Sequence, residues 1–158
     1  MMTRDEILAR LRLSAHWAPA VGIVPQFRTW LDVRQVDEEN WEHLGEYIFD
    51  SAVFGGRIIV PKGRLTDFAS VPRAPITYMV AGGRANGPAA IHDYLYSDQF
   101  CTREVADKVF MEAMLTDGTE FGQRPLSDWL ANVMYHEVST WGWIAWDRHA
   151  RGEKVRLP

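Results

Sequence analysis

Apolar residues in the C-terminal half of the chain recur every three or four positions, which is the period of an amphipathic helix. Within residues 88–115, Pro88 suits the first position of a helix, and His92 and Tyr96 follow on one face, one turn apart. After a short polar break, Thr102 is a suitable N-cap for a second helix. The pattern therefore predicts two consecutive helices joined by a short connection.

The second predicted helix has an apolar stripe, formed by Ala106, Val109, Phe110, Ala113 and Met114. Asp107 lies at the edge of this stripe, where its carboxylate is expected to be partly shielded from water. A shielded carboxylate must find a hydrogen-bonding partner or lose its charge. We expect His92 to be that partner, at the centre of the helical cluster. The helix is predicted to stop at Gly118, where glycine suits a left-handed cap, and residues 120–124 to form a loop.

A third, longer helix is predicted over residues 125–148, where apolar residues cover a wide arc. Asp128, His136 and Glu137 interrupt this run, and no stretch of about 18 uncharged residues is present, so we expect no membrane span. Four of the seven tryptophans fall in this segment, namely Trp129, Trp141, Trp143 and Trp146. We expect them to cover the core of the domain, with a position in a membrane interface as the alternative.

The N-terminal half shows a different pattern, because aromatic and β-branched residues with partial alternation run from residue 23 to residue 54. Gly55 and Gly56 suit a tight turn, so residues 47–61 are predicted to form a hairpin. Residues 37–43 are predicted to be a polar, acidic connector.

These patterns together predict the α+β class. We expect a small antiparallel sheet in the N-terminal half, from residue 27 to about residue 65, packed on a C-terminal cluster of three helices. A further short amphipathic helix is expected over residues 3–13, where it would pack on the domain or contact a partner.

Composition narrows the class of protein. The length of 158 residues is that of a single domain. The net charge is −4 and the Lys and Arg residues are scattered, which excludes nucleic-acid binding by phosphate neutralisation. The single cysteine, Cys101, cannot form an internal disulfide, and we see no charged-then-apolar leader, so the expected compartment is a reducing cytoplasm.

Residues 61–73 are predicted to form a rigid loop, because short polar side chains there hydrogen bond to nearby backbone and a proline holds the chain extended. The first interpretation is a turn that fixes the sheet to the helices. The alternative is that Asp67, Ser70 and Arg73 line the same binding site as His92.

Two segments carry a resemblance to a known family: V-P-K-G-R-L-T-D-F-A-S-V-P-R, and A-A-I-H-D-Y-L-Y followed by R-E-V-A-D-K-V-F-M-E-A-M. They resemble the two signature blocks of the phage-associated domain-of-unknown-function family 1353. The resemblance extends over about residues 44–146 of a single domain, with residues 1–37 as an N-terminal extension. It implies a bacteriophage or prophage origin and no particular activity. It also implies synthesis in the host cytoplasm, with the virion as the alternative location.

The helix pair alone is similar to phospholipase A(2), through its H-D-x-x-Y and A-D-x-x-F motifs. This resemblance implies that His92 is the general base for a water and that Asp93 is a calcium ligand. Tyr96 and Asp107 would orient His92. The sequence departs from that family in two ways, because the disulfides are absent and only residues 81–87 stand in place of the calcium loop.

The same residues allow other interpretations. In a structural one, they form a buried hydrogen-bonded clasp between two helices, with Asp93 paired to Arg73 or Arg103. In another, Asp67, His92 and Asp93 bind a metal ion.

Two nucleophilic alternatives pair His92 with Ser70 or with Cys101. No activating turn motif surrounds Ser70, and a single cysteine at the start of a helix is usually passive.

Two classes of function remain. The absence of a leader and of a calcium loop favours a non-catalytic virion, tail or host-interaction protein. The second class is a calcium-dependent, phospholipase-like hydrolase of a lipid or another envelope ester. The partners expected are other phage proteins or a membrane or lipid, without nucleic acid, and the oligomeric state stays open.

Overall fold

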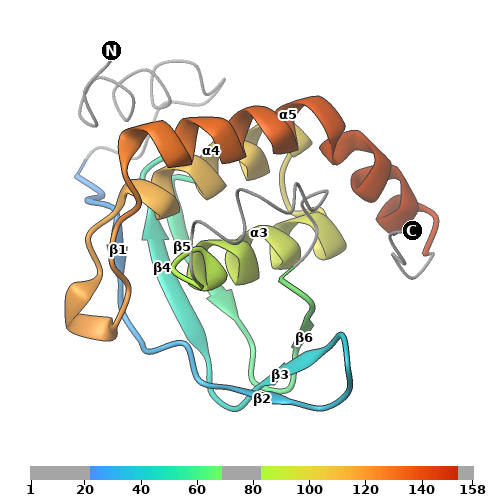
Figure 1. Ribbon diagram of the computed structural model, residues 1–158, viewed down its shortest axis with the longest axis horizontal. Helices are drawn as coiled ribbons and strands as arrows, with labels where there is room; N and C mark the ends of the chain where they lie inside the picture. The colour runs from blue at the N-terminus through green and yellow to red at the C-terminus, as the bar shows by residue number, and fades with distance from the viewer. Residues whose placement is uncertain (1–21, 69–82, 153–158) are drawn as a thin grey trace.

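The strands precede the helices in the chain, as the computed structural model of residues 22–68 and 83–152 shows (Figure 1). The predicted α+β class is confirmed, but the strands within the described ranges form two antiparallel sheets of three strands instead of one. The main sheet has the order β1 (Gln26–Phe27), β4 (Tyr47–Ser51) and β5 (Gly56–Val60). The second sheet has the order β2 (Val33–Gln35), β3 (Trp41–His43) and β6 (Leu65–Thr66). The helix predicted over residues 3–13 lies outside the described residues.

The β4–β5 hairpin forms most of the main sheet and confirms the hairpin prediction. Its two strands pair antiparallel over five residues each, and Gly55 in the turn has a φ of 78°, which glycine adopts without strain. Side chains of β4 alternate between the two faces, so Tyr47, Phe49 and Ser51 are buried while Asp50 lies on the opposite face. One face of the sheet therefore meets the core and the other meets solvent.

The second sheet corrects the prediction of a connector over residues 37–43. Trp41–His43 is strand β3, and it pairs with β2 across a polar turn. Oδ1 of Asp37 accepts hydrogen bonds from the backbone N–H groups of Glu39 and Asn40, at 2.9 and 2.8 Å. An aspartate that bonds the backbone ahead of it in this way forms a turn, so the acidic stretch closes a short hairpin.

The described residues contain three α-helices, α3 (Asn86–Asp98), α4 (Arg103–Leu115) and α5 (Asp128–Ala150). Helix α3 begins two residues earlier than predicted, so Pro88 is its third residue, where a missing N–H still breaks no helical hydrogen bond. The predicted N-cap of α4 is confirmed, because Oγ1 of Thr102 accepts from the backbone N–H of Val105 at 3.3 Å.

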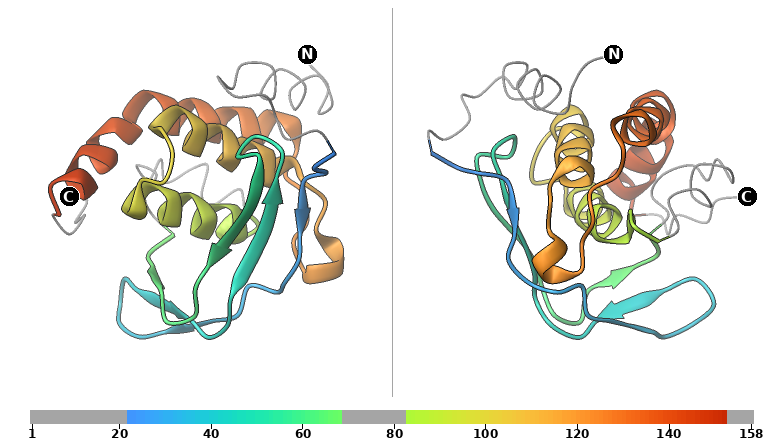
Figure 2. Two further views of the ribbon diagram at one scale, coloured as in Figure 1. Left: turned by 180° about the vertical axis from the view of Figure 1, so that it is seen from behind. Right: turned by 60° about the vertical axis from the view of Figure 1, so that its left-hand side comes forward.

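The elements form layers (Figure 2). Helices α3 and α4 pack on the inner face of the main sheet, and α5 packs across them on the side away from that sheet. The second sheet lies at one end of the molecule and contacts α3 through β6. The core fills the space between the main sheet and the helices, and its largest fully buried side chains include Tyr47, Phe49, Ile91, Leu95 and Phe110.

A buried glutamate fixes α4 to the hairpin. The side chain of Glu112 is fully buried and accepts a hydrogen bond from the hydroxyl of Ser51 at 2.5 Å. The backbone N–H groups of Ala52 and Val53 also donate to it, at 3.2 and 3.3 Å. These donors compensate the cost of removing a carboxylate from water, and they set the position of α4 on the sheet.

The segment after α4 differs from the prediction. Gly118 has a φ of −122°, so it is not a left-handed cap, and a short 3₁₀ helix, η1 (Thr119–Phe121), follows where a loop was predicted. Glycine is required at 118 for a different reason, because a Cβ there would lie 2.5 Å from the ring of Phe27. The glycine therefore permits close packing against β1.

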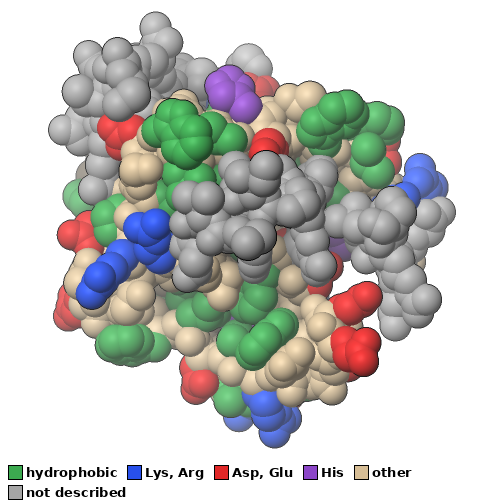
Figure 3. All heavy atoms as spheres, viewed as in Figure 1, with side chains coloured by type: hydrophobic (Ala, Val, Ile, Leu, Met, Phe, Trp, Pro, Cys, Tyr) green, Lys and Arg blue, Asp and Glu red, His purple; other side chains and the backbone are tan. Residues whose placement is uncertain are grey.

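The tryptophans of α5 do not cover the core as predicted. Trp129, Trp141 and Trp143 are 60%, 54% and 51% exposed, and hydrophobic side chains are visible at the surface over α5 (Figure 3). Only Trp146 of the four packs inward, edge-on to the ring of Tyr96 at 5.1 Å. The buried face of α5 consists of smaller residues, namely Leu130, Ala131, Met134, Val138, Gly142 and Ala145. Within the described ranges, no helix combines the length and the apolar character needed to cross a bilayer.

Candidate functional site

A buried hydrogen-bond network joins α3 to α4. Nε2 of His92 lies 2.9 Å from Oδ1 of Asp107, and the hydroxyl of Tyr96 donates to the same oxygen at 2.6 Å. The other oxygen, Oδ2, accepts from Nη1 of Arg103 at 3.2 Å. His92 and Tyr96 are fully buried, and the side chain of Asp107 is 3% exposed. The structure thus brings together the three residues that the helix pattern singled out.

The acceptors in this network determine which nitrogen of His92 carries the hydrogen. A carboxylate can only accept, so Nε2 of a neutral His92 donates to Asp107. The other nitrogen, Nδ1, then has a free lone pair. Nδ1 is buried and has no hydrogen-bond partner among the described residues. A histidine can act as a general base when a carboxylate holds one ring nitrogen and the other ring nitrogen is available to accept a proton. His92 has this arrangement.

Aromatic rings enclose the imidazole. The ring centroid of Tyr96 lies 4.0 Å from that of His92, and the centroid of Phe110 lies at 4.8 Å. Burial, and next to it the charge of Asp107, raise the pKa of Tyr96. The Tyr96 hydroxyl therefore keeps its proton and remains a donor to the carboxylate.

Arg103 extends the network to the third helix. Its Nη1 also lies 3.2 Å from the backbone carbonyl oxygen of Ser139 in α5, to which it donates. The sequence interpretation considered Arg103 as a partner of Asp93, but Arg103 pairs with Asp107, four residues later on the same helix face. The i, i+4 spacing of Arg103 and Asp107 is the feature of the sequence that could have predicted this ion pair.

A glycine allows α5 to approach the network closely. A Cβ at position 142 would lie 2.3 Å from the hydroxyl oxygen of Tyr96, far inside the normal contact distance. Gly142 is thus the small residue that makes room for the Tyr96 hydroxyl between α3 and α5.

Asp93 lies beside His92 in sequence, but its side chain bonds to a different element. Oδ2 of Asp93 accepts from the hydroxyl of Thr66 in β6 at 2.5 Å. Adjacent residues on a helix point about 100° apart, which is why His92 meets α4 and Asp93 meets the second sheet. The described part of the glycine run ends within α3 at Gly87, about 9 Å along the helix axis from Asp93. Calcium binding by Asp93 stays a prediction.

The metal alternative can be compared with the geometry directly. Within residues 22–68 and 83–152, no three His, Cys, Asp or Glu side chains are grouped so that they could hold a metal ion. Asp67, His92 and Asp93, which all lie in these ranges, therefore do not form such a group. The pairing of His92 with Asp107 also occupies its Nε2.

Of the predicted binding residues, Asp67 is described, and Ser70 and Arg73 lie outside the described residues. Asp67 is partly buried just after β6. Its charge acts on His149 near the end of α5, where it opposes the larger effect of burial, which lowers the pKa of His149. The roles of Asp67, Ser70 and Arg73 in binding stay predictions.

Cys101 does not have the character of an activated nucleophile. Burial, with the charge of Asp107 as the second cause, raises the pKa of the Cys101 thiol to about 11. The thiol is therefore protonated near neutral pH, and a protonated thiol is a weak nucleophile.

Comparison with curated proteins gives no match, and comparison with solved structures gives none. One family matches, with the description "Protein of unknown function (DUF1353)", over residues 41–138. This segment covers more than half of the chain and contains the four side chains that meet at Asp107, those of His92, Tyr96, Arg103 and Asp107 itself. It agrees with the family resemblance of the sequence, and it assigns no activity. The chain belongs to the DUF1353 family of proteins of unknown function.

Proposed function

We propose that the protein is a hydrolase in which His92 is the general base and Asp107 orients it. The observation that supports this proposal is the asymmetry of the imidazole, whose Nε2 meets a buried carboxylate while Nδ1 has no partner among the described residues. In the reaction, Nδ1 takes a proton from a water that attacks the substrate. Asp107 then stabilises the imidazolium that forms.

The other two members of the network hold the carboxylate in place. Tyr96 donates to Oδ1, the oxygen that also meets His92, and Arg103 donates to Oδ2. Both oxygens of Asp107 are therefore held by a donor other than His92. A carboxylate fixed at both oxygens keeps the imidazole ring in one orientation, which reduces the rearrangement needed during proton transfer.

The proposal requires that water and substrate can reach Nδ1 of His92. His92 is fully buried, so water and substrate reach it only after a local movement of the groups around it. The rings of Tyr96 and Phe110 are among the groups packed around the imidazole.

The substrate class proposed is an ester of a lipid or of another envelope component, as the similarity of the helix pair to phospholipase A(2) implies. On that similarity Asp93 would hold calcium, and the ion would supply polarisation of the ester carbonyl. Asp93 accepts a hydrogen bond from Thr66, so its carboxylate would have to share or give up this contact to bind the ion.

The test is hydrolysis of a short-chain phospholipid and of a p-nitrophenyl ester by the purified protein, with calcium or with a chelator. The expected result is turnover that His92→Gln abolishes and that Asp107→Asn lowers by about a hundredfold or more. Asp93→Asn should remove the calcium-dependent turnover, with the fold retained.

The matched control is His43→Gln, which makes the same substitution at another fully buried histidine, outside the network. This variant should keep its turnover when assayed well below its melting temperature. Turnover that survives His92→Gln, or no turnover of any ester by the parent protein, would overturn the proposal.

The second candidate is a non-catalytic contact protein of a virion or of its host, and the exposed tryptophans of α5 favour it. Trp129, Trp141 and Trp143 present large apolar surfaces to solvent, and tryptophan is enriched among the residues that dominate binding energy at interfaces.

This candidate is tested by mass spectrometry of virions purified from a phage that encodes the chain. Incorporation that falls on Trp143→Ser, and that is retained on Phe100→Ser, would support it. Phe100 is the matched control because it is 59% exposed and lies outside α5. Absence of the protein from the virion, together with no complex with another phage protein, would reject it.

A further inference from the structure

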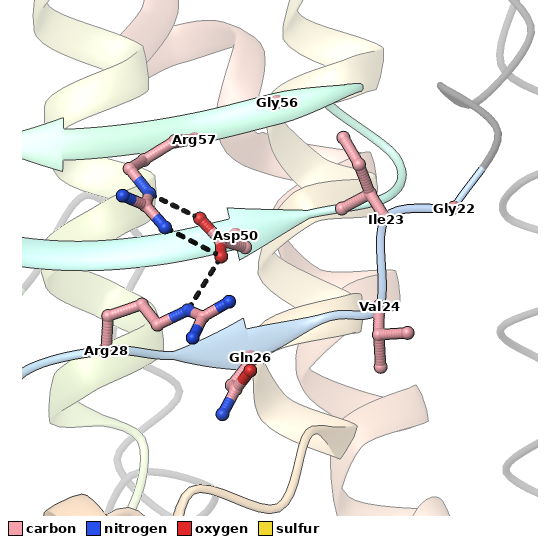
Figure 4. Close-up of a pocket in the computed structure, with 8 residues that line it drawn as sticks. All are labelled: Gly22, Ile23, Val24, Gln26, Arg28, Asp50, Gly56 and Arg57. Carbon is pink, nitrogen blue, oxygen red and sulfur yellow. Dashed lines mark hydrogen bonds and ion pairs between the residues drawn. The ribbon is translucent and has the colours of Figure 1, made fainter.

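The outer face of the main sheet carries a pocket that is separate from the His92 network. The pocket has a volume of about 600 Å³, and its lining residues come from β1 and the residues on either side of it, and from β4 and β5. Figure 4 shows these side chains in front of the sheet and the helices behind it. The helices that hold the His92 network pack on the opposite face, so the two sites do not share residues.

Two arginines converge in this pocket on one carboxylate. Nε of Arg57 donates to Oδ1 of Asp50 at 2.7 Å, and its Nη2 donates to Oδ2 at 3.2 Å. From the other side, Nε of Arg28 donates to Oδ2 at 2.7 Å. Figure 4 shows the two guanidinium groups on either side of Asp50. Arg57 is thus held by two bonds and Arg28 by one.

Some N–H donors of the two arginines do not take part in the hydrogen bonds to Asp50. Both terminal nitrogens of Arg28 and one terminal nitrogen of Arg57 have no hydrogen-bond partner among the described residues. The two guanidinium groups and the one carboxylate sum to a charge of +1. Asp50 is held ionised, since the hydrogen bond from Arg57 lowers its pKa, with Arg28 contributing to the same direction.

The rest of the lining is not charged. Ile23 and Val24 supply apolar side chains, and Val24 is 74% exposed. Gly22 and Gly56 leave the backbone open, since a Cβ at either position would meet nothing within 4 Å. The pocket therefore combines a charged part, at Arg28 and Arg57, with an apolar part at its Gly22 end (Figure 4).

We infer that this pocket binds a small amphiphile with an anionic head, a phosphate monoester or a carboxylate. The head accepts hydrogen bonds from the unused nitrogens of Arg28 and Arg57, for which a planar guanidinium is well suited. The apolar part of the ligand lies against Ile23 and Val24. Asp50 positions the arginines and is not itself a contact of the anion.

The test is a titration of the full chain, followed by NMR at the backbone amides of Gly22 and Gly56 and at the side-chain Nε–H groups of the arginines. The probes are inorganic phosphate, butyl phosphate and hexanoate, with hexanol as the neutral control. Butyl phosphate and hexanoate are expected to bind saturably and more tightly than inorganic phosphate, and hexanol is expected not to bind. Affinity is expected to fall as salt is raised.

Arg28→Gln is the decisive variant, because Arg57 keeps both of its bonds to Asp50 when Arg28 is changed. It should weaken the binding of butyl phosphate about tenfold, as expected for the loss of a charge-assisted hydrogen bond. Arg34→Gln is the matched control, since Arg34 is another exposed arginine paired with a carboxylate, Glu42, on the second sheet. It should change the affinity less than about twofold.

Three results would overturn the inference. They are no saturable shift at Gly22 and Gly56, an unchanged affinity in Arg28→Gln, and equal affinities for inorganic phosphate and butyl phosphate. Equal affinities would show that the apolar part of the ligand contributes nothing to binding, so the ligand would not be an amphiphile.

Discussion

Two carboxylates in this protein each hold several donors, and they differ in their access to water. Asp107 lies between helices with its side chain 3% exposed and accepts from three donors on α3 and α4. Asp50 lies on the outer face of the main sheet with its side chain 13% exposed. The two arginines that donate to Asp50 are themselves 45% and 52% exposed.

The difference lies in what happens when the carboxylate is removed. The arginines around Asp50 can be solvated by water, so an exposed ion pair contributes little to stability. The imidazole of His92 and the hydroxyl of Tyr96 are enclosed and cannot recover a lost hydrogen bond in this way. Similar chemistry therefore supports the helical core at one site and leaves open donors for a ligand at the other.

The largest effect is expected for Asp107→Ala. The change leaves His92 and Tyr96 buried without their shared acceptor, and it removes the ion pair of Arg103. The free energy of unfolding should fall by about 3 kcal/mol. Urea unfolding followed by circular dichroism measures this. An unchanged midpoint would mean that the network does not form in solution.

The next effect is expected for Gly142→Ala. Alanine in place of glycine within a helix normally stabilises by about 1 kcal/mol, but here the new Cβ would lie 2.3 Å from the Tyr96 hydroxyl. The sign should reverse, with a loss of about 1–3 kcal/mol as the Tyr96 side chain or α5 is displaced.

A double-mutant cycle with Tyr96→Phe isolates the cause of that loss. Without the hydroxyl, the clash at position 142 is largely relieved, so Gly142→Ala should cost much less in the Tyr96→Phe background. Equal costs in the two backgrounds would show that the hydroxyl is not the group that α5 accommodates.

A smaller, pH-dependent effect comes from a buried histidine that lacks such a network. His43 is 1% exposed and neither ring nitrogen has a partner within the described structure. Burial lowers the pKa of His43 below the ordinary 6.5. Below that pH the unfolded chain takes up the proton more readily than the folded chain, so stability is complete above about 6.5 and is lost as pH falls toward the folded pKa.

The comparison of His43→Phe with the parent measures this contribution. Phenylalanine keeps a ring next to Tyr47 and cannot titrate, so its melting temperature should fall less between pH 7 and pH 5. Part of the slope should persist, because burial lowers the pKa of His149 as well. Identical slopes in the two proteins would show that His43 is not enclosed in solution.

The network around Asp107 could be predicted from the sequence because its contacts are local. His92 and Tyr96 share a helix face through their spacing, and Asp107 lies beside an apolar stripe on the next helix, joined by a short connection. The N-cap at Thr102 and the turn at Gly55 are local signals of the same kind, and both predictions are confirmed.

The parts that were missed depend on residues far apart in the chain. Glu112 accepts a hydrogen bond from Ser51, 61 positions away in the sequence. The periodicity of α4 therefore does not indicate that the hairpin supplies the donors for this carboxylate. Gly118 was assigned a conformational role, whereas the ring of Phe27 is what excludes a side chain there. The exposure of Trp141 likewise depends on how α5 lies across its neighbours, which hydrophobicity alone does not specify.

The smallest effect is expected for Asp50→Asn, which keeps the shape of the side chain and removes its charge. The urea midpoint should fall less than for Gly142→Ala, because Arg28 and Arg57 regain hydration when they are released. The small loss should disappear in high salt, since exposed charges are screened over about 8–10 Å, whereas the loss from Asp107→Ala should persist. A loss at Asp50 that is large and insensitive to salt would mean that the outer face of the sheet is as enclosed as the helix pair. The unused arginine donors would then be closed to a ligand, and the contrast between the two carboxylates would fail at the point where the anion pocket depends on it.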